Sequence, residues 1–125
     1  MTLKVNDILN IYYSLSKIAD KEIDFNTACI IASNLKELSV SKEVFEKKRN
    51  EIVMKYGEKD KNDSIKQDEN GSIKIKDTDT FMKEMDNLIL SETDVNLIYI
   101  SKKSIKDLKV SAKDVMGLIP ILKEE

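Results

Sequence analysis

The chain has 125 residues, of which 41% are hydrophobic and 35% are charged, so it can bury one core and keep a solvated surface. Its formal net charge is −2 and Arg49 is its only arginine, which argues against nucleic acid as the main ligand because phosphate recognition favours a basic, arginine-rich surface. The chain contains no histidine, one cysteine and three glycines, which argues against zinc sites of the usual composition, disulfides within the chain and glycine-rich phosphate loops.

These exclusions predict a protein that works by binding and not by catalysis. We expect no enzyme activity, catalytic residue, metal site or cofactor. We also expect one domain over residues 1–125, with a helical part over about 7–56 and a part made of a hairpin, a helix and a strand over about 64–125. The N-terminus lacks the apolar stretch of a signal peptide and no window reaches the length of a membrane span, so a cytoplasmic location is expected.

The first predicted helix covers about residues 7–19, with Asn6 as its N-cap. Apolar residues recur there at three- and four-residue steps, which is typical of one buried helix face. We expect Tyr13 to lie beside that face. The face itself consists of Ile8, Leu9, Tyr12, Leu15, Ile18 and Ala19.

The strongest periodic signal predicts a long amphipathic helix over about residues 26–56. Steps of three and four residues join nine positions, of which seven are apolar or aromatic. We expect Cys29 to be a buried small hydrophobic residue and Gly57 to end the helix in a left-handed conformation. Poor helix formers at 38–41 leave open a split into two helices. The row of nine, named the seam below, is Ala28, Ile31, Leu35, Leu38, Lys42, Phe45, Arg49, Ile52 and Tyr56.

Lys42 and Arg49 interrupt the seam with charge, and this has two interpretations. In the first, the distal half of the helix extends beyond the core, and both side chains lie over apolar neighbours with their charges in water. In the second, two copies of the chain pair through that half as a coiled-coil homodimer. The first is favoured because a short seam with two charges is weak support for a dimer.

A hairpin is predicted around residues 65–75, where alternating isoleucines flank a turn sequence. A two-residue loop of Asn70 and Gly71 would mix charge into the apolar face. A three-residue loop that also includes Glu69 sets Ile75 opposite Ile65 and places Gly71 in a left-handed bulge position. We prefer the three-residue loop.

The remaining elements are a helix, a strand and a short helix. Asp77 is expected to cap a helix over about 78–91, and residues 95–100 read as a strand that can join the hairpin. Ser111, with Asp114 three residues on, resembles a capping box for a last helix that Gly117 weakens and Pro120 limits. The predicted buried face of the 78–91 helix is Phe81, Met82, Met85, Leu88 and Ile89.

The sequence thus predicts an α+β fold with an N-terminal helical hairpin that includes one long helix. A small antiparallel β-hairpin or three-stranded sheet and further short helices complete it. Two features would present themselves to a protein partner, namely the distal half of the long helix and the lysine-rich hairpin. The expected partner-binding residues are Lys42, Glu46, Arg49, Val53, Ile65, Ile73 and Ile75.

The order of segments resembles an uncharacterised family of short proteins encoded by phages and prophages of Gram-positive bacteria. The resemblance rests on VNDILNIYYSLSKIADKEI, NEIVMKYGEKD, DENGSIKIKD with the following FMKEM, and VSAKDVMGLI. Ala112 departs from the family's pattern, in which proline is usual. The family implies a phage-derived origin and no known activity.

Two hypotheses follow from small size, missing catalytic groups and the implied phage origin. The leading one is an interaction protein in the host cytoplasm that binds a bacterial or phage protein and inhibits or adapts it, for example as an antagonist of a host defence system such as CRISPR-Cas. The alternative is an accessory structural or assembly component of the virion, from the tail or packaging region. In either case we expect no membrane association and no nucleic-acid ligand.

Overall fold

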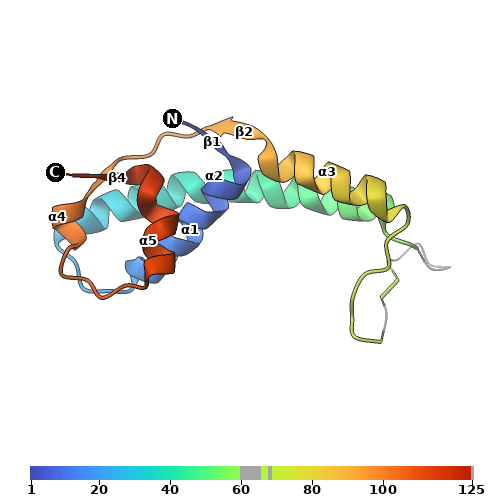
Figure 1. Ribbon diagram of the computed structural model, residues 1–125, viewed down its shortest axis with the longest axis horizontal. Helices are drawn as coiled ribbons and strands as arrows, with labels where there is room; N and C mark the ends of the chain where they lie inside the picture. The colour runs from blue at the N-terminus through green and yellow to red at the C-terminus, as the bar shows by residue number, and fades with distance from the viewer. Residues whose placement is uncertain (60–65, 68, 125) are drawn as a thin grey trace.

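One long helix runs along most of the length of the molecule (Figure 1). The structure is a computed structural model that describes residues 1–59, 66, 67 and 69–124. The predicted α+β class is confirmed. In chain order the elements are β1 (Thr2–Lys4), α1 (Val5–Ala19), α2 (Phe25–Tyr56), α3 (Thr78–Leu90), β2 (Glu92–Asp94), β3 (Ile100–Ser101), α4 (Lys102–Ile105), α5 (Ala112–Leu118), a 3-10 turn (Ile119–Ile121) and β4 (Leu122–Lys123).

Helix α1 confirms the first predicted helix, but it begins earlier than the cap signal suggested. Asn6 lies inside the helix, and the N-cap is Lys4, which makes no side-chain capping bond. The strand β1 ends directly before it, and the Val5 N–H donates to the Ser91 carbonyl at 2.9 Å. The start of α1 is therefore set by pairing with a distant segment. Ala19 is exposed, contrary to prediction, and the buried face includes Ile11 in its place.

Helix α2 is continuous over 32 residues, so the weak segment at 38–41 does not split it. Leu38 is fully buried there, and the Ser39 hydroxyl donates to the Leu35 carbonyl at 2.7 Å. Asp24 caps the helix by accepting the Thr27 N–H at 3.0 Å. The left-handed ending predicted at Gly57 is wrong: its φ is −68° and its ψ is 135°, because it continues as extended chain.

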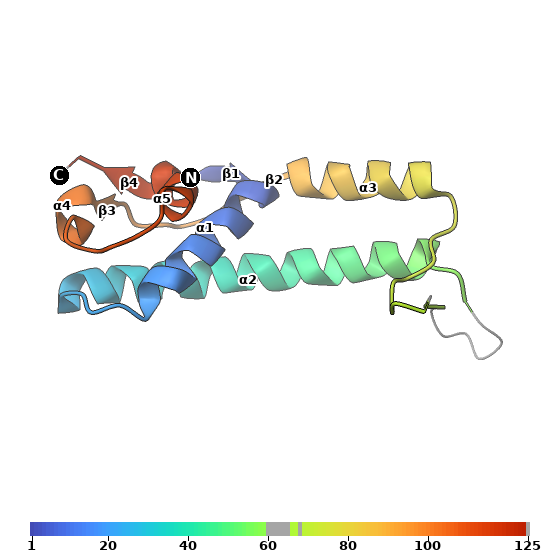
Figure 2. The same cartoon turned by 60° about the horizontal axis from the view of Figure 1, so that its bottom comes forward.

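The seam of α2 is buried or half-buried along its whole length, as predicted. Its distal half does not extend alone, because α3 lies along it in Figure 2 and shares a small core of Val5, Phe45 and Leu88. Around its proximal half lies the main core. That core consists of Ile8, Ile11, Leu15, Ile18, Ile31, Leu38, Val95, Ile100, Leu118 and Ile121.

The hairpin has the predicted register at the residues that the structure describes. Gln67 pairs with Ile73 in antiparallel fashion, which fits the three-residue loop, and Gly71 has a φ of +82°. The partner expected for Ile75, Ile65, lies outside the described residues. Ile75 pairs with Gly57, so the hairpin is joined to the end of α2.

The strand predicted at 95–100 is wrong, and no three-stranded sheet forms among the described residues. Two separate pairs occur: β1 with β2 in antiparallel register and β3 with β4 in parallel register. The segment 95–99 between β2 and β3 is extended but pairs with a side chain. The Ile98 N–H donates to Asn34 Oδ1 at 2.8 Å, and Asn34 Nδ2 donates to the Ile98 carbonyl at 2.9 Å. Asn34 is fully buried, and this bond pair substitutes for a neighbouring strand.

The caps predicted for α3 and α5 are confirmed. Asp77 accepts the Thr80 N–H at 3.3 Å, and Ser111 accepts the Asp114 N–H at 3.1 Å. Met82 is exposed, so its predicted place on the buried face of α3 is wrong. Gly117 has a packing role as well: a Cβ there would lie 2.1 Å from Ser14 Oγ, so only glycine lets α5 approach α1 this closely.

Candidate protein-binding groove

A groove of about 270 Å³ lies where α1, α2, α3 and β2 meet. It exists because β1 and β2 pair and tie the end of α3 to the start of α1, while one side of α2 in the middle of the molecule receives no helix. The Val95 N–H extends this tie by donating to the Met1 carbonyl at 2.8 Å. The groove is lined by Val5, Ile8, Leu9, Glu37, Val40, Ser41, Val44, Phe45, Lys48, Leu88, Ser91, Thr93 and Asp94.

The surface of the groove is mainly apolar. Phe45 and Leu88 are buried side chains of its lining, and each is only 9% exposed. Val40 and Val44 lie one turn apart on α2 and remain 60% and 49% exposed. Two exposed valines next to a buried aromatic ring form an apolar surface from which a bound partner can exclude water. The groove therefore offers apolar area that this chain itself leaves uncovered.

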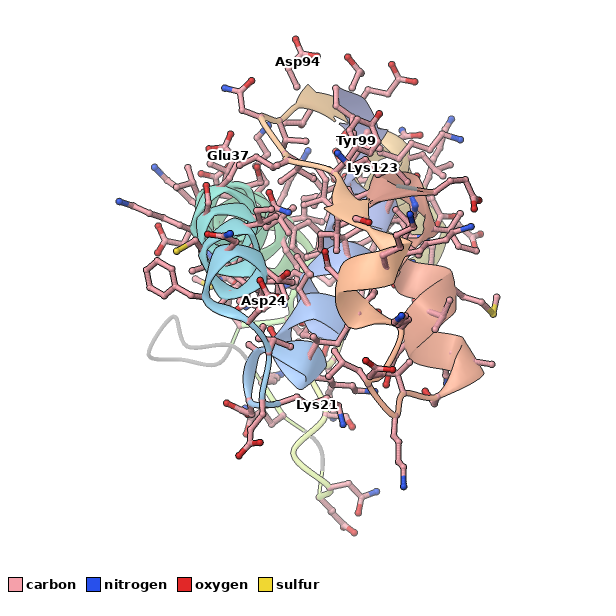
Figure 3. The ribbon with its side chains drawn as sticks, turned by 90° about the vertical axis from the view of Figure 1, so that its left-hand side faces the viewer. Lys21, Asp24, Glu37, Asp94, Tyr99 and Lys123 are labelled. Atoms are coloured by element: carbon pink, nitrogen blue, oxygen red, sulfur yellow. The ribbon has the colours of Figure 1, made fainter. Side chains whose placement is uncertain are left out.

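Charges of opposite sign lie at the two ends of the groove. Glu37 and Asp94 lie at one end, and Figure 3 shows both in the upper part of the view, on α2 and at the end of β2. Glu37 accepts the Asn96 N–H at 3.2 Å, and Asp94 accepts the Thr2 hydroxyl. Lys48 lies eleven residues further along α2, which is about 16 Å at 1.5 Å per residue. The groove is thus acidic at one end and basic at the other.

The partner-binding residues expected on α2 lie on a different side of that helix. Lys42 and Glu46 form an ion pair, and Lys42 Nζ lies 5.4 Å from the centre of the Tyr12 ring. The hydrogen bond to Glu46 raises the pKa of Lys42, and the same bond lowers the pKa of Glu46. Arg49 lies over the Phe45 ring at 5.8 Å, and Val53 is half-buried. These side chains are engaged within the chain.

The isoleucines expected to bind a partner lie at the far end of α2. Ile73 is exposed and Ile75 is half-buried, whereas Ile65 is outside the described residues. None of the described hairpin residues lines the groove. The structure therefore does not join the two predicted surfaces into one site.

Sequence reasoning missed the residues that do line the groove. Val40 and Val44 are spaced by four residues and lie off the seam of α2, so they form a second apolar row. That four-residue spacing off the seam is the sequence signal that could have indicated this second apolar row. Glu37 and Asp94 gave no comparable signal, because their proximity depends on the pairing of β1 with β2.

Other chemistry was sought over the described part of the chain. Cys29 is exposed, which contradicts its predicted burial, because it faces away from the seam. Residues 1–59, 66, 67 and 69–124 contain no cluster of three or more metal-ligating side chains. In the same ranges, every helix is too short or too polar to serve as a membrane span.

No family model, curated protein or solved structure matches this chain. The resemblance to phage and prophage proteins therefore remains a prediction from the sequence.

Proposed function

We propose that this chain is a non-enzymatic, phage-encoded protein-binding module that holds an amphipathic helix of a bacterial or phage protein in the groove between α1, α2 and α3. The observation that carries the proposal is the open valine pair above Phe45, with charges of opposite sign at the two ends. Binding there would inhibit or adapt the partner. The phage origin rests on the sequence resemblance alone.

A helix is the occupant that fits the groove best. The span of about 16 Å between Glu37 and Lys48 corresponds to about three helical turns. An amphipathic helix presents apolar side chains at steps of three and four residues, which matches a continuous apolar floor. Its N-terminus carries partial positive charge and its C-terminus partial negative charge, so its dipole favours the Glu37 and Asp94 end for the N-terminus and Lys48 for the C-terminus.

The test is site-specific photo-crosslinking followed by binding to a synthetic peptide. A photo-reactive phenylalanine analogue replaces Val44 in one variant and Met82 in the control, since Met82 is similarly exposed at 52% and does not line the groove. We expect Val44 alone to crosslink to one bacterial or phage protein, within a helical segment. Crosslinks into an extended segment or into a second copy of this chain would overturn the proposal.

The crosslinked segment, made as a peptide, gives the quantitative test. We expect Val44→Glu to weaken its binding by roughly tenfold or more, because the partner's apolar side chains would bury a carboxylate and Lys48, four residues on, offsets only part of that desolvation. Met82→Glu is the matched control and should bind as the parent does. Equal losses in both variants would show that the groove is not the binding surface.

A further inference from the structure

Two stretches of the chain carry charge of opposite sign. Residues 101–113 contain five lysines and one acidic residue, Asp107, whereas residues 77–94 contain six acidic residues and one lysine, Lys83. Figure 1 shows α4 and α5 at one end of the molecule and α3 at the other. The stretch 101–113 therefore forms a basic patch, which can attract an acidic ligand.

The basic patch also carries an apolar cup of about 250 Å³. The cup lies between α4, α5 and β4, and its walls come from residues packed at the edge of the main core. Lys102 and Lys106 are exposed and stand at its margin. The apolar lining residues are Ile105, Leu108, Val110, Val115, Leu118 and Leu122.

The chain's own C-terminal segment shows how this surface engages an extended acidic strand. Leu122 lies in β4 and lines the cup, while Glu124, two residues further on, accepts a hydrogen bond from Lys102 Nζ. Side chains two positions apart in an extended strand point to the same face. A segment whose apolar residue enters the cup can therefore bring a carboxylate, two positions later, to the lysines at its margin. Lys106 has no partner among the described residues and is open to a second carboxylate.

We propose that this basic cup binds an extended acidic segment of a partner protein in which apolar and acidic residues alternate. The apolar side chain enters the cup, one carboxylate pairs with Lys106, and a second replaces Glu124 on Lys102. A nucleic acid supplies phosphates but no aliphatic group for the cup, and the positive side chains here are lysines, which lack the bidentate geometry of arginine. The cup and the groove described above lie on different elements, so this proposal does not depend on the helix-binding function.

The test uses the purified full chain and a fluorescein-labelled peptide in which leucine and glutamate recur two positions apart on a serine background. We expect fluorescence anisotropy to show saturable binding that weakens with added salt. Replacing leucine by serine, or glutamate by serine, should each abolish saturation. Equal binding of the peptide without leucine, or tighter binding of a single-stranded oligonucleotide of the same formal charge, would overturn the proposal, as would no binding of the parent peptide.

The variant Lys102→Gln/Lys106→Gln provides the test within the protein. Two exposed charge pairs together should account for roughly a fivefold loss of affinity. The matched control is Lys21→Gln/Lys36→Gln, which removes two exposed lysines outside the cup and should bind as the parent does. All four lysines are exposed, so thermal melting should show both variants folded. Equal affinities in the two variants would refute the assignment to this cup.

Discussion

The two ends of this molecule are stabilised very differently. At the end that holds α1, α4 and α5, called the head, ten buried residues form one core and ten half-buried residues pack around it. Along the distal half of α2, called the arm, α3 and the start of α1 contribute, and the described residues form a core of three buried side chains. Figure 2 shows this contrast, with several elements meeting at the head and the two helices α2 and α3 side by side in the arm.

The contrast explains where the groove lies. The groove forms at the junction of the head and the arm, where the head core ends and α3 is the helix that covers α2. A core of three residues cannot cover both sides of α2, so Val40 and Val44 stay exposed there. Apolar area open to a partner is therefore a consequence of the thin core of the arm.

The first prediction compares one leucine from each region. Leu15→Ala in the head should lower the free energy of unfolding by about 4 kcal/mol, because it removes a fully buried side chain from a dense core. Leu88→Ala in the arm should cost about 2 kcal/mol, because its core is small and α3 can move to fill the space. Urea unfolding followed by circular dichroism measures both values.

A further readout tells whether the arm opens on its own. Amide hydrogen exchange should show faster exchange along α3 in Leu88→Ala while α1 and α5 stay protected. If the two substitutions cost the same and exchange rises throughout the chain, head and arm are one cooperative unit and the comparison fails.

The second prediction concerns Asn34, which holds the extended segment of the head. Asn34→Ala leaves the Ile98 N–H and carbonyl without their partners, and we expect a loss of about 2–3 kcal/mol in the free energy of unfolding. Asn34→Asp keeps the acceptor but buries a carboxylate against the Ile98 carbonyl, so at neutral pH it should cost at least as much as Asn34→Ala. Ser33→Ala, at an exposed neighbour, is the control and should change stability by under about 0.5 kcal/mol. A loss in Asn34→Ala no greater than in the control would mean that water replaces the side chain.

The third prediction concerns the contact of α5 with α1. Gly117→Ala places a Cβ 3.0 Å from the Asn10 carbonyl oxygen and closer still to Ser14 Oγ, so α5 must move away. We expect a loss of about 1–3 kcal/mol, despite the better helix propensity of alanine. Gly71→Ala is a useful comparison, because that site has open space and its cost comes from a φ of +82° alone. Thermal melting measures both, and a Gly117→Ala protein as stable as the parent would show that the approach is looser than described.

Local signals in the sequence predicted much of this fold. The spacing of apolar residues gave the extent of α2, and the caps at Asp77 and Ser111 were found because a cap involves residues only three positions apart. The hairpin register followed from keeping charge off one face, and the Gln67–Ile73 pair agrees with it. These features depend on neighbours in the chain.

The wrong predictions concern features that depend on contacts between residues distant in the sequence. The start of α1 depends on pairing with β2, and residues 95–100 have a strand's composition, but Ile98 within them bonds to the Asn34 side chain. Gly57 carries a helix-ending signal, yet pairing with Ile75 keeps it extended. The groove was not predicted for the same reason, since Glu37 and Asp94 line one groove only after β1 has paired with β2.

The last prediction concerns acid, and it tests whether carboxylates support the head. Hydrogen bonds from Thr27 lower the pKa of Asp24, and the hydrogen bond from Lys17 lowers the pKa of Asp114. Because both folded-state pKa values lie below the ordinary aspartate pKa of 3.8, the stabilisation is present above that pH and is lost as pH falls through the folded values.

The double variant Asp24→Asn/Asp114→Asn removes both titrations while asparagine still caps α2. We expect the urea midpoint of the parent to fall between about pH 5 and pH 2, and that of the variant to fall less. Glu46 in the arm also has a lowered pKa, so part of the acid dependence should persist in the variant. Identical pH profiles would place the acid sensitivity outside the head, because neither Asp24 nor Asp114 would then contribute to it.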